Sequence, residues 1–188
     1  DGDGLAAWPA AATRTGAKHF AGDVVYSGVS SPFDYPVQTR VRVVTDIAKN
    51  DPDQIAAALR ELIVAAGGGV LGLFTSIARL KAVQARLVED DKLKRFLLLA
   101  QHVDPLDTGT LVDIFRAEED ACLLGTDAVR DGVDVPGRSL RMIVFDRVPW
   151  PRPTILHRAR KTCFAELPYD DLMTRLRLKQ AYGRLIRR

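Results

Sequence analysis

The sequence predicts an α/β domain in which a mainly parallel sheet is covered by helices on both faces. Short apolar runs alternate along the chain with longer segments whose apolar residues recur at helical spacing. The runs lack polar alternation, which is typical of strands buried on both faces. Because the chain has 188 residues, 47% of them hydrophobic, it is long enough for one sizeable domain and short for two.

The first part of the chain carries few signals of regular structure. Residues 1–38 are rich in Gly, Pro, Ser and Ala, and residues 30–38 read SSPFDYPVQ, a turn-rich connector whose prolines exclude a helix. Residues 40–46, RVRVVTD, alternate and are rich in β-branched side chains, so we predict a strand there. We therefore expect a connector and edge region over residues 1–38 and the main domain over residues 39–188.

Helices and buried strands are predicted to alternate from residue 51 onward. The first helix begins after Asp51 and Pro52 and ends at the three glycines 67–69. Residues 149–153, PWPRP, form an extended loop. Strands are expected at residues 70–74, 96–101, 121–125 and 140–146. One further helix is expected after the cap Thr75-Ser76 and another after a cap at Asp107 or Thr108. The last two helices are expected over residues 154–162 and 169–188.

Polar loops follow three of the predicted strands directly. These loops are Thr75-Ser76, residues 102–104 and the turn-rich residues 126–137. In parallel sheets, crevices that bind ligands open beyond the carboxyl ends of the strands. We therefore expect the three loops to gather at one edge of the sheet.

The charge is distributed unevenly along the chain. Residues 1–146 hold 16 basic and 21 acidic side chains, whereas residues 147–188 hold 11 basic and three acidic ones. A basic C-terminal segment on a mildly acidic body indicates an anionic partner, such as nucleic acid or a nucleotide phosphate, or else a solvated surface.

The last stretch, residues 175–188, reads RLRLKQAYGRLIRR and concentrates this charge. Arginine suits phosphate because its planar guanidinium group stays charged and can donate hydrogen bonds to two phosphate oxygens at once. The alternative is a solvated helix end, where cations meet the favourable end of the helix dipole. Wound as a helix, the stretch aligns Gln180, Gly183, Arg184 and Arg187 on one stripe and leaves Leu178, Tyr182, Leu185 and Ile186 for docking on the other side.

Several classes of site are unsupported. The two cysteines and three histidines have no ligand or disulfide spacing, so we expect no metal site and reduced thiols in the cytoplasm. No run is long and apolar enough to cross a membrane. The glycine-rich residues 67–76, GGGVLGLFTS, lack the Lys and Ser/Thr of a phosphate-binding P-loop, so the chain has no Walker A motif.

Three segments resemble motifs IV, V and VI, in order, of superfamily 2 helicases: FTS at 74–76, LLGTDAVRDGVDVPG at 123–137 and QAYGRLIRR at 180–188. GVDVPG followed by a strand and VPWPRP, with LRLKQAYGRLIR at the end, is similar to the DinG branch of the DinG/XPD-like DNA helicases. SPFDYPVQ resembles that branch's connector into its second motor domain, so the resemblance covers nearly all of residues 30–188.

The resemblance implies a RecA-like, P-loop NTPase-like three-layer domain that lacks its own Walker A motif. Such a domain is the second motor domain of an ATP-dependent helicase that moves 5′ to 3′ along single-stranded DNA, with a role in repair or replication. ATP and Mg²⁺ would be bound mainly by a first RecA-like domain carrying motifs I to III, which would lie upstream of this chain, and the chain would stop within motif VI. The chain alone is then expected to be inactive, and an iron–sulfur cluster elsewhere in the parent is left open.

The resemblance also assigns roles by position. The arginine fingers would be Arg184 and Arg187, with Gln180, Gly132 and Asp134 as nucleotide contacts. Thr75, Ser76, Thr126 and Gln101 would bind DNA phosphates. Arg130-Asp131 stand where the family has Trp-Glu, which is a departure from the family's pattern.

Each assignment has a structural alternative. Thr75 and Ser76 can cap their helix, and Asp134 can brace its turn. Trp150 can stack on a base, but between prolines we expect it to pack over a loop. Arg158, Arg160 and Lys161 can form a solvated helix face. For the chain as a whole, the alternatives are a free-standing nucleic-acid-binding module with a helicase-like fold and a nucleotide-binding regulatory domain.

Overall fold

The computed structural model describes residues 8–9, 11–13, 15–126, 129, 134–135, 137–164 and 168–186. The chain divides into two compact units, residues 1–40 and residues 41–188. The first unit contains a 3₁₀ turn, η1 (Ala17–His19), and the short helix α2 (Tyr35–Gln38). All strands and the longer helices of the described residues belong to the second unit.

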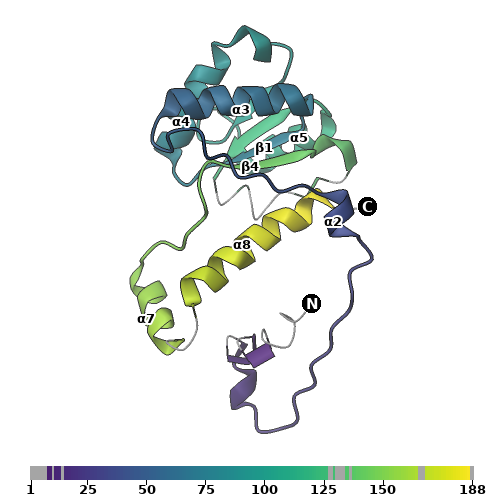
Figure 1. The fold of residues 1–188 in the computed structure, drawn as a ribbon, viewed down its shortest axis with the longest axis vertical. Helices are drawn as coiled ribbons and strands as arrows, with labels where there is room; N and C mark the ends of the chain where they lie inside the picture. Colours follow the sequence, from purple (N-terminus) through teal and green to yellow (C-terminus); the bar gives the residue numbers. More distant parts are fainter. Residues whose placement is uncertain are drawn as a thin grey trace. The chain divides into compact units, whose positions relative to one another are not determined.

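A four-stranded, all-parallel sheet forms the centre of the second unit (Figure 1). Its strands lie in the order β2-β3-β1-β4, so β1 and β3 are central. Leu73 pairs with Gly125 on one side and with Phe145 on the other, which aligns the ends of three strands. The four strands predicted from the apolar runs are confirmed as β1 (Val70–Leu73), β2 (Leu98–Ala100), β3 (Cys122–Gly125) and β4 (Met142–Phe145).

Side chains alternate along the strands between two separate cores. Val70, Cys122 and Leu124 pack with α3 (Pro52–Ala66) and α4 (Ile77–Val88) on one face. Leu71, Leu73 and Leu123 pack with α5 (Thr108–Ala117) and α8 (Tyr169–Leu185) on the other. Because both faces are covered, the strands contain no solvent-facing polar positions, and the predicted three-layer α/β architecture is confirmed.

The helices begin where the sequence predicts them. Asp51 accepts hydrogen bonds from the backbone N–H groups of Asp53 and Gln54 at the start of α3, where Pro52 occupies the first helical position. Asp107 accepts from Gly109 and Thr110 at the start of α5, so Asp107 and not Thr108 is its cap. The short 3₁₀ turns η2 (Asp91–Leu93) and η3 (Gly137–Ser139) complete the connections on this unit.

The amino ends of the strands are closed by a turn and an arginine. Gly68 has a φ of 90°, and a Cβ there would lie 2.4 Å from the carbonyl oxygen of Asp120, so this position requires glycine. Arg141 donates to the carbonyl oxygens of Gly67 and Gly68 and pairs with Asp120. This edge of the sheet is therefore filled by its own polar contacts, and the opposite edge carries the candidate site.

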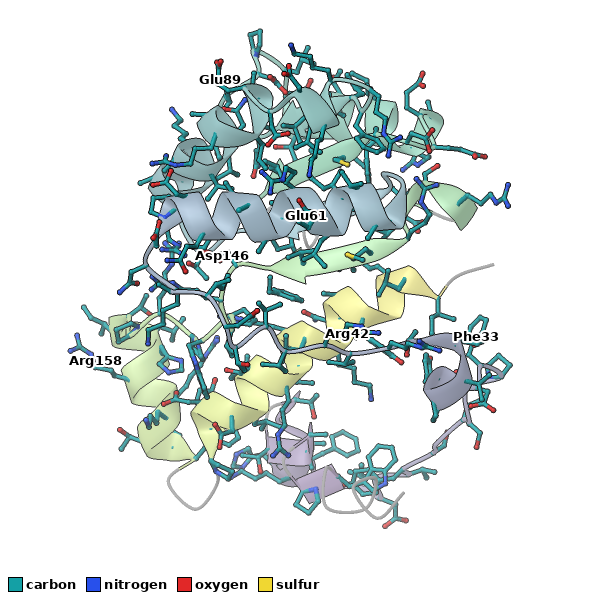
Figure 2. The ribbon with its side chains drawn as sticks, turned by 45° about the horizontal axis from the view of Figure 1, so that its top comes forward. Phe33, Arg42, Glu61, Glu89, Asp146 and Arg158 are labelled. Atoms are coloured by element: carbon teal, nitrogen blue, oxygen red, sulfur yellow. The ribbon has the colours of Figure 1, made fainter. Side chains whose placement is uncertain are left out.

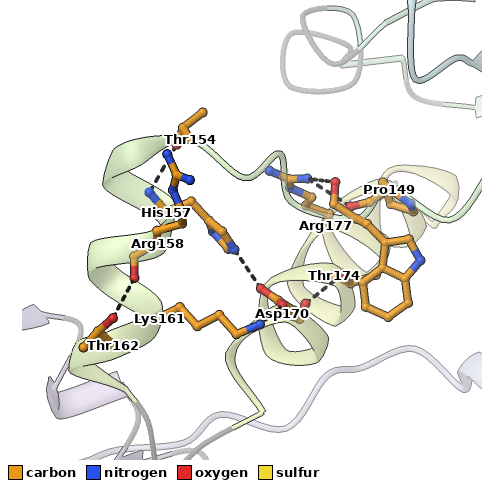
Figure 3. Close-up of polar contacts among 10 residues, drawn as sticks. Pro149, Thr154, His157, Arg158, Lys161, Thr162, Asp170, Thr174 and Arg177 are labelled. Atoms are coloured by element: carbon orange, nitrogen blue, oxygen red, sulfur yellow. Dashed lines mark hydrogen bonds and ion pairs between the residues drawn. The ribbon is translucent and has the colours of Figure 1, made fainter.

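A helical pair follows the sheet. α7 (Ile155–Cys163) is capped by Thr154, and it contacts the start of α8 through His157 and Lys161, both of which bond the Asp170 carboxylate (Figure 3). Asp170 has a lowered pKa because it accepts from Lys161 first and from His157 second. The C-terminal half of α8 packs against the sheet through Ala181 and Leu185.

Two local predictions are wrong. Residues 41–45 form no strand: they are extended, but they pair with no strand of the described residues, and Val41 and Val43 are each 81% exposed. The prolines of residues 30–38 do not exclude a helix, since α2 places Pro36 in its first turn, where a missing N–H costs nothing, and Asp34 caps it.

Candidate nucleic-acid and nucleotide interface

Four polar residues lie side by side at the carboxyl edge of the sheet. Gln101, Thr126, Thr75 and Asp146 follow β2, β3, β1 and β4, which is the order of the strands in space. The ladder continues to this row, because Gln101 N–H donates to Leu124 O at 2.9 Å and Asp146 N–H donates to Leu73 O at 3.0 Å. The predicted gathering of the Thr75-Ser76 and 126–137 loops at one edge is therefore confirmed at Thr75 and Thr126.

Gln101 connects the ends of β2 and β3 through its buried amide. The residue is 4% exposed, and its Oε1 accepts from both the N–H and the hydroxyl of Thr126, each at 3.0 Å. Its Nε2 donates to the hydroxyl of Thr108 at 3.0 Å. In this arrangement Gln101 faces Thr126 and not solvent, so it orients Thr126.

The loop after β1 is held by a buried carboxylate. The backbone N–H of Thr75 donates to Asp146 Oδ1 at 3.0 Å, and Arg79 Nε donates to Asp146 Oδ2 at 2.5 Å. The Asp146 side chain, at the carboxyl end of β4 (Figure 2), is 1% exposed. Arg152 Nη2 donates to the Thr75 carbonyl oxygen at 3.2 Å. Both backbone polar groups of Thr75 are therefore fixed, while its hydroxyl bonds to none of the described residues.

Ser76 caps α4, as the structural alternative predicted. Its Oγ accepts from the N–H of Arg79 at 3.3 Å. A capping hydroxyl uses a lone pair and keeps its own proton, so Ser76 can cap the helix and still donate to an anion. The structural and functional interpretations of Ser76 are thus compatible.

Sequence reasoning missed Asp146, Arg79 and Arg152, which hold the Thr75 loop. Asp146 and Thr75 are 71 positions apart, and Arg152 and Thr75 are 77 apart. One signal was present for Asp146: it directly follows the apolar run that forms β4, at the same edge as the predicted site residues. Nothing in the spacing of the two arginines indicates their partners.

The loop after β3 is described only in part. Val129 and Val135 are fully buried, and a Cβ on Gly125 would lie 2.4 Å from Cγ2 of Val129, so glycine is needed where Val129 packs on the end of β3. Asp134 is exposed, and its backbone carbonyl oxygen accepts from Arg116 Nε at 2.9 Å. Gly132, the predicted close-approach position, lies outside the described residues.

The predicted arginine helix is shorter than expected. α8 ends at Leu185, and Ile186 leaves the helical conformation with φ −115° and ψ 90°. Gln180 is exposed and Arg184 is half-buried, whereas Arg187 lies outside the described residues. Leu185 of the expected docking side packs in the core, and Ala181, which was not expected there, is buried beside it.

α8 and the loop after β3 share one core. Ala181 and Leu185 of α8 belong to the same buried cluster as Val129 and Val135. Arg184, which precedes Leu185, is therefore carried on a helix that packs against the loop bearing Asp134. The two segments assigned to the nucleotide are thus joined by apolar contacts.

Other kinds of site were also sought among the described residues. They contain no group of three or more His, Cys, Asp or Glu side chains placed to hold a metal ion. In the part of the chain that the structure describes, no helix is both long enough and apolar enough to span a membrane. Trp150 is 55% exposed, so the expectation that it packs over a loop is wrong. Arg158, Arg160 and Lys161 are exposed on α7.

Comparison with known proteins agrees with this fold. Residues 59–188 match the family model of the helicase C-terminal domain, so the chain belongs to that family. It is 36% identical over 172 residues to the ATP-dependent helicase DinG of Mycobacterium tuberculosis, a match that covers 85% of this chain and 25% of that protein. The resemblance of its motifs to the DinG-like helicases is thereby confirmed.

Two further relatives also match most of this chain over a small part of their own length. The chain is 30% identical to the ATP-dependent DNA helicase YoaA of Escherichia coli, over 84% of this chain and 26% of that protein. It is 29% identical to the 3′-5′ exonuclease DinG of Bacillus subtilis, over 85% of this chain and 19% of that protein. The chain therefore spans about a quarter or less of the length of these relatives.

Proposed function

We propose that this chain is the second motor domain of an ATP-dependent DNA helicase that moves 5′ to 3′ along single-stranded DNA. Its carboxyl sheet edge would hold the DNA backbone, and α8 would face a nucleotide bound on a first RecA-like domain. The observation that carries the proposal is that hydroxyl-bearing loops follow neighbouring strands at one edge of the sheet. One of these loops, the loop after β3, shares a hydrophobic core with α8. Cytoplasmic DNA repair or replication is the setting in which such a motor would work.

The proposed DNA grip uses hydroxyl and backbone donors. Thr75 and Ser76 would donate to successive phosphates. Thr126 would do so by turning its hydroxyl away from Gln101, because its N–H and its hydroxyl both donate to Gln101 Oε1 in this structure. Such donors hold phosphates without reading bases, which a translocating motor requires. Asp146 supports this role because it fixes the loop that carries Thr75.

The proposed nucleotide contacts are Arg184 and Arg187 as arginine fingers, with Gln180, Gly132 and Asp134 beside them. Bound ATP with Mg²⁺ supplies the phosphoanhydride bond whose hydrolysis drives the motor. The guanidinium groups would stabilise charge that develops on the transferring phosphoryl group, an effect worth roughly 10³ to 10⁵ in rate. Arg184 is half-buried, and its helix is held against the core by Ala181. Both features support this role, because they restrict the positions that the guanidinium group can take.

Coupling between the two sites would run through the loop after β3. Thr126 begins this loop and would face the DNA, and Asp134 would face the nucleotide. Because Val129 and Val135 share a core with Ala181 and Leu185, a shift of α8 would displace the loop. Hydrolysis could then alter the grip on the strand.

The test replaces single arginines in the full-length protein that contains this chain. Arg184→Ala and Arg187→Ala should each lower DNA-stimulated ATP hydrolysis by about 10³-fold or more while leaving single-stranded DNA binding within about threefold. Arg175→Ala is the matched control, since Arg175 is an exposed arginine on the same helix, and it should leave turnover unchanged.

Two results would count against the proposal. Unchanged turnover in both variants would remove the finger assignment. Equal loss of DNA binding and ATP turnover would favour a nucleic-acid-binding role for these arginines. The chain would then be better described as a nucleic-acid-binding module with a helicase-like fold.

A further inference from the structure

One exposed aromatic side chain lies on a firmly held loop beside the proposed DNA grip. Trp150 is 55% exposed, although tryptophan is usually well buried in a folded domain. It belongs to the extended PWPRP loop that joins β4 to α7. An indole left in solvent on a loop of defined conformation requires an explanation.

The backbone on either side of the indole is fixed. Trp150 precedes Pro151, which restricts Trp150 to extended conformations, and it follows the buried Pro149. Arg177 of α8 donates from Nη1 to the carbonyl oxygens of Pro149 and Trp150, at 2.9 and 3.0 Å (Figure 3). The exposure of Trp150 is therefore a property of an ordered loop, and little backbone entropy is lost when a ligand stacks on it.

The same loop is tied to the site proposed for a DNA phosphate. Arg152, two residues after the indole, donates to the carbonyl oxygen of Thr75 at 3.2 Å. The Thr75 N–H is in turn held by Asp146, which follows β4 directly, just before the loop. The loop that carries Trp150 is therefore joined by a hydrogen bond to the backbone of the Thr75-Ser76 loop.

The charge around the indole favours an anionic ligand with flat, apolar surfaces. Residues 147–164 contain five basic and no acidic side chains. Arg152 and Arg158 are exposed within this segment, and Arg158 points outward from α7 (Figure 2). Aromatic side chains among basic ones are typical of single-stranded nucleic acid binding, in which bases stack on the rings while cations neutralise phosphates.

We propose that Trp150 is a stacking platform for an unpaired base of the DNA strand whose phosphates are held at Thr75 and Ser76. This inference rests on the proposed DNA grip and adds a base contact to it. The stack is tolerant of sequence, because every base presents a π face. A protein surface would be a less suitable occupant, since the exposed Arg152 and Arg158 would then need acidic partners.

The test uses the 188-residue chain carrying Trp8→Phe, so that Trp150 is its single tryptophan. The probes are an oligothymidylate and an abasic oligonucleotide with the same number of phosphates. We expect the oligothymidylate to quench the Trp150 fluorescence saturably and to bind roughly 5- to 150-fold more tightly than the abasic strand, the range for stacking of one base.

Two substitutions separate stacking from folding. Trp150→Ala should bring the affinity for oligothymidylate down to that for the abasic strand and leave abasic binding unchanged. Trp150→Phe should keep most of the preference, since a smaller ring still stacks. Because Trp150 is largely exposed, both variants are expected to retain the circular dichroism spectrum of the parent chain.

The outcomes separate the two proposals. Equal affinity for both strands, or undiminished oligothymidylate binding by Trp150→Ala, would overturn the stacking role and leave the phosphate grip standing. Failure to bind either strand would overturn the grip and the stack together.

Discussion

At the scale of single residues, Asp146 has the clearest structural role at the candidate site. A carboxylate that is 1% exposed is costly unless its charge is compensated, and here Arg79 and the Thr75 N–H both donate to it. The same Arg79 donates to the carbonyl oxygen of Lys49, so the group also ties the segment before α3 to the sheet edge. A single acidic side chain thus sets the conformation of the loop proposed to hold DNA.

Asp146→Ala should therefore lower the free energy of unfolding by about 3 kcal/mol, near the low end for breaking a buried ion pair because Arg79 is partly exposed. Asp146→Asn keeps an acceptor for Thr75 and should cost about 1 kcal/mol. Urea unfolding at neutral pH measures both values. Asp53→Ala is the matched control: Asp53 also pairs with an arginine, Arg86, but its side chain is 76% exposed, and we expect little change. A loss no larger for Asp146→Ala than for Asp53→Ala would contradict the bracing role.

At the scale of elements, buried strands and capped helices follow from local sequence. The run at residues 70–73 forms β1 because continuous apolar side chains suit a strand covered on both faces. Residues 41–45 show the limit of this reasoning, since β-branched residues favour an extended backbone but a strand also needs a partner ladder. Gln101 shows the corresponding limit at the site. Its place at a strand end is predictable, whereas its bond to Thr126, 25 positions away, is set by strand order.

The contact between α7 and α8 depends on a titratable group. The pKa of Asp170 is lowered, first by Lys161 and then by His157, so the folded state binds its proton less readily than the unfolded chain. A lowered pKa contributes stability that is present above the ordinary value of 3.8 and is lost as the pH falls through the folded-state pKa. The pairing of the two helices should therefore weaken in acid.

We predict that Asp170→Asn lowers the amide hydrogen-exchange protection of α7 at pH 7, and that this difference from the wild type disappears at a pH below the lowered pKa of Asp170. Asp171→Asn is the control, because Asp171 lies in the same first turn of α8 and shares the favourable position near the helix N-terminus. Equal effects of the two substitutions would assign the protection to the helix dipole and not to the contact with α7.

At the scale of the whole molecule, the charge asymmetry coincides with the layout of the domain. The basic residues 147–188 contain the Trp150 loop, α7 and α8, whereas the mildly acidic residues 1–146 contain all four strands of the described sheet together with α3, α4 and α5. A polyanion would therefore meet the last third of the second unit and the sheet edge beside it. Binding through such contacts should weaken as salt rises, because each neutralised phosphate releases counterions.

The division of labour proposed between two motor domains makes a prediction for this chain on its own. Its 188 residues contain no Walker A motif, so they lack the lysine and the hydroxyl that hold the phosphates and Mg²⁺ in P-loop enzymes. Arginine fingers stabilise charge on a phosphate that another surface has bound, and by themselves they provide no site for the attacking water. The purified chain should therefore release no phosphate from ATP above the protein-free background, with or without single-stranded DNA, while the full-length protein turns over under the same conditions. The opposite result would be ATP hydrolysis by the chain that persists through purification to constant specific activity and is abolished by Arg184→Ala. That result would mean that the 188 residues form a complete active site.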